Sequence, residues 1–258
     1  MSVLRKTLAV TLITVTLLRA QEGGDIQAQI LYAYHTEDTN SLMALIQELS
    51  AKLRDADDNA LRYHLAHAQY RLGELSVGAS HRAESAYSEC IDDLTPLLKK
   101  DVKSAEVLIL QGACYGALAD LSPLQSILLR SHAADRLANA AKLEPRNPRL
   151  LLIESTQGLA HSKADSERGK EALAQLNMAV KEFDDSSATR VDAPGWGHAE
   201  AFLAMGARVA SARRLGRCTQ LDRKVVDRRS RLQGRSTAAC RARQALNFAR
   251  VRPAANLV

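Results

Sequence analysis

The sequence predicts an all-α protein built from antiparallel helix pairs. Ala and Leu dominate the apolar residues, and aromatic residues make up only 4% of the 258-residue chain. This composition favours helices because strands are usually rich in β-branched and aromatic side chains. Apolar residues also recur three and four positions apart over most of the chain, which is the spacing of one buried helix face. Breaks containing Pro, Gly or several polar residues divide these runs into pairs.

Residues 21–58 are expected to form the first helix pair. The segments Ile26–Tyr34 and Asn40–Leu53 carry apolar residues at helical spacing. The polar break Asp55–Asn59 then offers Asp and Asn side chains, which accept hydrogen bonds from the free amide groups at a helix start. A new helix is therefore expected to begin at this break.

Three further helix pairs and half of a fourth are expected within residues 59–206. The residue before a proline is pushed out of helical geometry, so Glu144–Pro148 separates the second of these pairs from the third. The Ser122-Pro123 sequence marks a break inside the second pair. The expected pairs are Leu61–Gly73 with Ala83–Leu98, two helices within Leu108–Pro148, and Arg149–Ala160 with Gly169–Phe183; Trp196–Gly206 opens the fourth.

These segments resemble the tetratricopeptide repeat, a unit of about 34 residues made of two antiparallel helices. The residues that carry the resemblance lie in the central pair and follow the repeat pattern within each helix: Leu108, Gly112, Tyr115, Ala133, Leu137, Ala140 and Pro145. About nine extra residues around Ser122-Pro123 depart from that pattern. The resemblance implies a right-handed superhelical array whose first helices line a concave groove, and it implies a scaffold that binds a protein or peptide there.

Four residues of the first repeat, Tyr63, His67, Tyr70 and Arg71, fall where the resemblance places the lining of this groove. Tyr and Arg are the residue types that most often anchor a protein partner. We therefore expect these four side chains to form the partner-binding surface.

Cys90 and Cys114 are candidates for a disulfide bond. They lie on the second helix of one pair and the first helix of the next, and such helices are neighbours in a stacked array. We expect their Cα atoms within disulfide reach, about 4.4–6.8 Å. Together with Cys218 and Cys240 they match no spacing of a zinc module.

Residues 1–20 have the layout of a secretory signal peptide. Arg5 and Lys6 precede an apolar run of about a dozen residues, and the small Ala20 stands before a polar stretch. That run is too short to span a bilayer comfortably. We expect cleavage near Ala20, export to the periplasm, and no membrane span in the mature chain.

No sequence pattern predicts catalysis. The common signatures for phosphate binding, acyl transfer, zinc proteases and dinucleotides do not occur in the sequence. Cys114, between Gly112 and Gly116, is interpreted as a small packing residue rather than a nucleophile. His64 and His67 lie one helical turn apart but have no evident further metal ligands. We therefore expect a binding protein with no catalytic residue, no metal site and no cofactor.

The last segment, Ala207–Val258, differs in kind from the rest of the chain. It holds 14 Arg and Lys against two acidic residues, whereas the preceding residues hold 21 basic and 27 acidic residues. Like charges at this density repel, and we expect the segment to be largely disordered or loosely attached. No Glu follows Glu200, and a second hypothesis is that the gene is read out of frame from about this point.

An alternative function is binding of nucleic acid or another anionic surface through this Arg-rich tail. The tail offers Phe248 as its only aromatic residue for base stacking. An exported protein also meets little nucleic acid. A nucleic-acid partner is therefore not expected.

Overall fold

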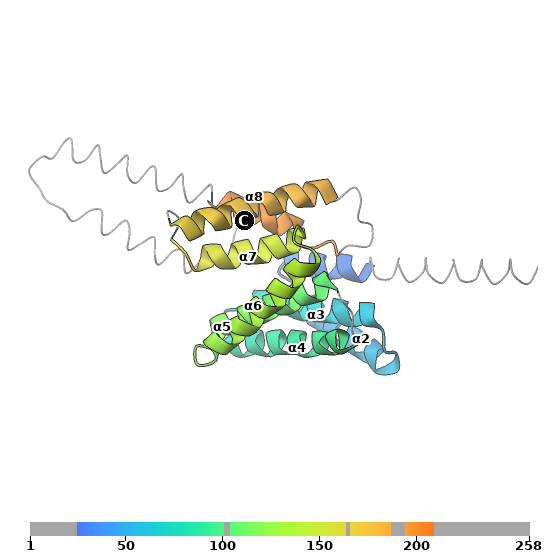
Figure 1. Ribbon diagram of the computed structural model, residues 1–258. Helices are drawn as coiled ribbons and strands as arrows, with labels where there is room; N and C mark the ends of the chain where they lie inside the picture. The colour runs from blue at the N-terminus through green and yellow to red at the C-terminus, as the bar shows by residue number, and fades with distance from the viewer. Residues whose placement is uncertain (1–24, 101–103, 164–165, 187–193, 209–258) are drawn as a thin grey trace, which may run out of the picture.

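The computed structural model describes residues 25–100, 104–163, 166–186 and 194–208. Throughout these residues the only regular secondary structure is helix, and consecutive helices pack against each other as antiparallel neighbours (Figure 1). This confirms the expected all-α array of helix pairs. Residues 1–20, which are expected to form a signal peptide, and the tail from residue 209 onward lie outside the described residues.

The helices follow one another in pairs along the chain. A helix over residues 25–35 pairs with α2, and a last helix over residues 198–208 ends the described chain. The helices between them are α2 (Thr39–Asp55), α3 (Asn59–Leu75), α4 (Ser80–Lys99), α5 (Ala105–Leu121), α6 (Ser126–Leu143), α7 (Pro148–Ala160) and α8 (Glu167–Ser186).

Side-chain caps mark several of the helix starts. Asp58 accepts hydrogen bonds from the N–H groups of the second and third residues of α3, and Asn147 does the same for α7. Pro148 suits the first position of α7 because the N–H that it lacks would have no partner in the helix. A turn over residues 122–125, which includes the Ser122-Pro123 sequence, joins α5 to α6.

Apolar side chains form three clusters along the array. The first lies between helix 25–35, α2 and α3, the second is centred on α4 and α5, and the third lies between α7, α8 and helix 198–208. Small residues allow close approach at several helix contacts; a Cβ atom added to Gly112 of α5 would lie 2.9 Å from the Leu137 side chain of α6. In the described part of the chain, no helix combines the length and apolar character needed to cross a bilayer.

The end of the described chain returns to its beginning. Helices α7 and α8 lie together as a layer on one side of the helices from α2 to α6 (Figure 1). After α8, the turn at Gly195 approaches Gln27 of helix 25–35, and Trp196 contacts α3. The inner sides of helix 25–35, α3, α5 and α7 are thus brought together around the residues that precede helix 198–208.

Candidate functional site

The point at which these inner sides meet is a buried cluster of polar and aromatic side chains, here called the inner-face cluster. Its members come from five parts of the chain that are distant in sequence. They are Tyr34 of helix 25–35, Tyr63, His67, Arg71 and Glu74 of α3, Glu106 of α5, Arg149 of α7, and Trp196 and Glu200 at the start of the last helix. Tyr63, His67 and Arg71 are spaced four residues apart, which places them along one face of α3.

Arg71 lies at the centre of the inner-face cluster and is only 2% exposed. One of its terminal nitrogens donates to Glu74 Oε2 at 2.7 Å and the other to Glu200. Its Nε donates to His67 Nε2 at 3.1 Å, and its guanidinium lies 4.3 Å from the centroid of the Tyr34 ring. Arg71 is thus buried away from water, and two carboxylates neutralise its charge, as a buried cation requires.

Trp196 closes the cluster from the other side. Its indole stacks on the His67 ring with centroids 5.5 Å apart, and its Nε1 donates to the Tyr63 hydroxyl at 3.1 Å. Gly197 has a φ angle of 104°, which a residue with a side chain rarely adopts. The Gly197 N–H donates to Glu200 Oε2 at 2.9 Å, as in the half of a capping box that reaches back to the N-cap. Glu200 therefore starts its own helix and contacts Arg71.

A second ion pair lies beside Trp196. Arg149 of α7 donates to Glu106 Oε1 of α5 at 3.0 Å, and its guanidinium lies 5.7 Å from the Trp196 ring. Asn147, which caps α7, donates to the same Glu106 oxygen at 2.8 Å. The cap of α7 and the inner-face cluster are thus one hydrogen-bonded unit.

Burial governs the protonation of this cluster. It lowers the pKa of His67 well below the usual imidazole value, and the nearby Arg71 charge lowers it further. A neutral His67 then accepts the Arg71 hydrogen bond at Nε2, with its proton on Nδ1. Burial raises the pKa of Glu74, and Arg71 opposes that rise. Within the described residues, four buried atoms of the cluster have no hydrogen-bond partner: the Tyr34 hydroxyl oxygen, His67 Nδ1, Glu106 Oε2 and Arg149 Nε.

The four expected groove residues are enclosed by the chain itself. His67, Tyr70 and Arg71 are buried and Tyr63 is partly buried. Tyr63, His67 and Arg71 contact Trp196 or Glu200, whereas Tyr70 packs against the Tyr87 ring with centroids 6.0 Å apart. The structure therefore buries three of these side chains and leaves Tyr63 partly exposed.

Sequence patterns did not single out the other members of the cluster, among them Glu106, Arg149 and Glu200. Each is a charged residue near the start of a helix, where a capping or exposed role is the ordinary interpretation. No local spacing relates these residues to Arg71, because the partners are up to 129 residues apart in sequence.

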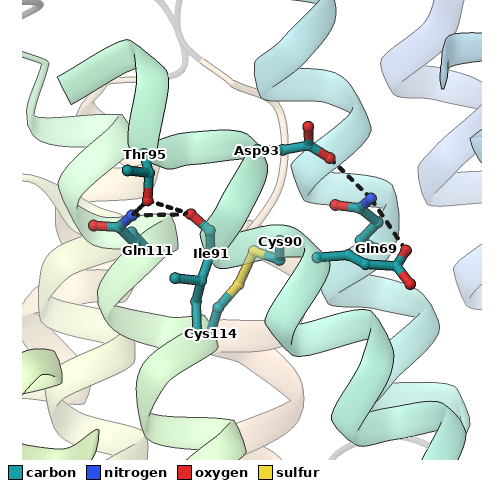
Figure 2. The surroundings of a disulfide bond; sticks show 8 residues. Gln69, Cys90, Ile91, Asp93, Thr95, Gln111 and Cys114 are labelled. Carbon is teal, nitrogen blue, oxygen red and sulfur yellow. Dashed lines mark hydrogen bonds between the residues drawn. A yellow bond between two sulfur atoms is a disulfide. The ribbon is translucent and has the colours of Figure 1, made fainter. Parts of the chain in front are cut away.

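Cys90 and Cys114 form a disulfide bond that joins α4 to α5 (Figure 2). Both residues are fully buried, and their Cα atoms are 6.5 Å apart. Beside the bond, Gln111 Nε2 of α5 donates to the Ile91 carbonyl of α4 at 3.2 Å and to Thr95 Oγ1 at 3.1 Å. The second and third helix pairs are therefore joined by both a covalent bond and buried hydrogen bonds.

The turn between α5 and α6, together with the first turn of α6, exposes three large aliphatic side chains, here called the apolar tip. The exposed fractions are 102% for Leu124, 88% for Ile127 and 60% for Leu128. No charged residue occurs between residues 121 and 129. At the border of the tip, Arg130 donates to Asp120 Oδ1 at 2.7 Å. The tip is thus an uncharged apolar surface with a polar border.

The part of the chain that the structure describes contains no group of three or more His, Cys, Asp or Glu side chains arranged to hold a metal ion. In the pair considered from sequence, His67 Nε2 is occupied by Arg71.

Comparison with solved structures finds a similar fold in the HusA haemophore from Porphyromonas gingivalis. The TM-score is 0.55 at 18% sequence identity, over 69% of this chain and 88% of that chain. At this identity the likeness concerns the fold. No family model matches the chain and no curated protein matches it. The resemblance to the tetratricopeptide repeat therefore remains an expectation from the residue pattern, and the structure shows an array of helix pairs.

Proposed function

We propose that this protein is a non-catalytic binding protein that recognises another protein through the apolar tip. The observation that carries the proposal is the exposure of Leu124, Ile127 and Leu128 in an uncharged stretch that comprises the turn before α6 and the start of α6. Burying one such side chain fully is worth about 1.5–3 kcal/mol, so three of them supply a gross contribution of roughly 4–9 kcal/mol. Contiguous exposed apolar side chains with a polar border are typical of interaction sites.

Binding of a protein at the apolar tip fits the structure better than binding of a peptide in the concave groove. The inner side of the array is filled by Trp196 and Glu200, so an extended peptide finds no open groove at Tyr63, His67 and Arg71. The apolar tip lies instead at a hairpin end, where a partner with an apolar depression can cover it. The likeness to a haemophore, itself a binding protein by name, supports a binding role for this fold.

The experiment compares partner capture by three versions of the full-length chain. The double variant Leu124→Asp/Ile127→Asp places two charges on the tip, and Tyr32→Asp is the control because Tyr32 is 73% exposed on helix 25–35, away from the tip. Each tagged protein is incubated with the exported fraction of its host, and the retained proteins are identified by mass spectrometry. Equal melting temperatures establish that all three are folded.

We expect the unmodified chain and Tyr32→Asp to retain the same protein, and the tip variant to retain at least tenfold less of it. Equal retention by the tip variant, or the absence of any protein retained above a blank matrix, would refute a protein-binding tip.

Export is part of the proposed function. The proposal derives from the layout of residues 1–20, and the intact mass of the protein purified from its host measures it directly. A mass that corresponds to a chain beginning near Gln21 supports export to the periplasm. A mass that corresponds to the chain with its first 20 residues contradicts export.

A second candidate function is haem binding, since the fold is similar to that of a haemophore. One surface feature favours it: the exposed His132 of α6 lies beside Tyr115 of α5, with ring centroids 5.3 Å apart. Leu128 is one helical turn away on α6. Titration with haemin, followed by the Soret absorbance, tests this function. A spectral change that His132→Ala abolishes supports it, whereas an unchanged haemin spectrum excludes it.

A further inference from the structure

The last described helix, over residues 198–208, has large apolar side chains on an exposed side. Its inner side belongs to the apolar cluster that it shares with α7 and α8 (Figure 1). Its outer side carries Phe202 and Leu203, which are 51% and 49% exposed and are here called the terminal face. No charged residue occurs between Glu200 and Arg208. This helix is therefore apolar on both its inner and its outer side.

An apolar outer side is unusual for the last helix of a stacked array. Each helix pair buries its apolar side chains against the next pair, and the terminal element normally presents a polar outer surface to water. A helix with apolar residues on all sides normally lies between neighbours that cover them. The terminal face therefore indicates that one more element packs on helix 198–208.

We propose that the segment Leu215–Val226 of this chain covers the terminal face as a further helix, antiparallel to helix 198–208. Four of its apolar residues recur three or four positions apart, which is the spacing of one helix face. These residues are Leu215, Cys218, Leu221 and Val225. A helix of this length extends about 18 Å, and helix 198–208 extends about 16 Å, so the two lengths match.

The position of this segment in the chain favours it over any other occupant of the terminal face. Helix 198–208 carries the terminal face, and the chain continues directly from Arg208. Residues 209–214 separate the helix from Leu215, which fits the connections of about 2–8 residues that commonly join antiparallel helices. The segment is thus close enough to turn back onto the helix that precedes it.

Electrostatic attraction favours the same contact. The Arg-rich tail Ala207–Val258 holds 14 basic residues against two acidic ones, whereas acidic residues outnumber basic residues 27 to 21 in the preceding chain. Opposite net charges attract the tail to the folded body. Apolar contact at the terminal face then gives the expected loose attachment of the tail a specific place.

Hydrogen–deuterium exchange of the full-length chain, followed by mass spectrometry, tests the proposal. An isolated helix of this length is marginal in water, so slow amide exchange within Leu215–Val226 reports packing and not helix formation alone. The double variant Phe202→Ser/Leu203→Ser removes the terminal face. The matched control is Leu124→Ser/Ile127→Ser, which removes two exposed aliphatic side chains from the apolar tip.

We expect the amides of Leu215–Val226 to exchange at least about tenfold more slowly than those of an unstructured chain, both in the unmodified protein and in the control. In Phe202→Ser/Leu203→Ser they should exchange at the rate of an unstructured chain. Equal melting temperatures of the variants establish that the rest of the protein is folded.

A reciprocal variant keeps the proposal testable if the changes on helix 198–208 disturb the fold. Leu215→Ser/Leu221→Ser alters only the covering segment and leaves every described residue unchanged. It should abolish the slow exchange of Leu215–Val226 and should accelerate exchange of the amides in helix 198–208, because that helix loses its outer neighbour.

Three results would overturn the proposal. The first is exchange of Leu215–Val226 at the rate of an unstructured chain in the unmodified protein. The second is slow exchange that persists in both serine variants of the contact, or that only the tip control abolishes, since the segment then packs elsewhere. The third is a dimer in sedimentation velocity that Phe202→Ser/Leu203→Ser dissociates while Leu215–Val226 exchanges rapidly, because the terminal face then binds a second copy of the chain.

Discussion

Replacing Glu200 by Gln tests whether the inner-face cluster holds the two ends of the array together. The substitution keeps a side chain that can accept the Gly197 N–H, since Gln also serves at this position of a capping box. It removes one of the two negative charges that contact Arg71. Glu74 then remains as the single carboxylate beside a guanidinium that is 2% exposed.

The expected loss of unfolding free energy follows from these contacts. Removing one partner of a buried ion pair costs about 3–5 kcal/mol when the other charge is left alone. Because Glu74 still neutralises Arg71, we expect a loss at or below the lower end of this range, about 2–3 kcal/mol. For a folded region of this size, each kcal/mol shifts the melting temperature by about 2–4 °C. The variant should therefore melt about 4–12 °C below the unmodified chain.

Urea unfolding followed by far-UV circular dichroism measures this loss. The matched control is Glu167→Gln, since Glu167 pairs with Lys170 on the surface of α8 and both side chains are more than half exposed. That control should change the unfolding free energy by no more than about 0.5 kcal/mol. A Glu200→Gln variant as stable as the control would refute the interpretation that the Arg71 ion pairs connect the ends of the chain.

Three further outcomes are expected. Reducing the disulfide, or replacing Cys90 and Cys114 by Ser, should lower the unfolding free energy by about 3.5 kcal/mol, which is the chain-entropy value for a separation of 24 residues. Urea titrations with and without dithiothreitol measure this loss. His67 is neutral in the folded protein, and in the unfolded chain it takes up a proton near pH 6.5. The unfolding free energy should therefore fall as the pH drops below about 6.5, by at most about 1.4 kcal/mol per pH unit. Between pH 7 and pH 5.5, denaturant titrations should show a smaller fall for His67→Gln than for the unmodified chain. Gly73→Ala should destabilise by about 1–3 kcal/mol because the new methyl group overlaps a buried tyrosine ring, whereas Gly206→Ala, with open space around it, should stabilise by about 0.5–1 kcal/mol; thermal melts distinguish the two signs.

Patterns within single segments identified most of the helices. Apolar spacing and the Asp58 and Asn147 caps act over a few residues, so they can be recognised without knowledge of the rest of the chain. The stacking of consecutive helices in repeat proteins also predicted that Cys90 and Cys114 are neighbours, because this prediction needs no information about distant parts of the chain.

The inner-face cluster was different. Sequence placed Tyr63, His67 and Arg71 on one face of α3, since a helix repeats every 3.6 residues. Which residues cover that face depends on the superhelical twist of the array. This twist is the sum of small angles between consecutive helices, to which every helix contact contributes. In the structure the face is covered by Trp196 and Glu200, and no local pattern connects these residues to α3.

The sequence by itself therefore determined the all-α class, the order of the helix pairs and the faces on which their apolar and aromatic side chains lie, because periodicity and capping are local properties. Only the tertiary structure decided that the inner face is closed. A buried charge such as Arg71 must find a carboxylate, and Glu74 lies three residues away on the same helix, but no local spacing relates either Glu106 or Glu200 to it. Their positions in the folded array assign Glu74 and Glu200 to Arg71 and Glu106 to Arg149.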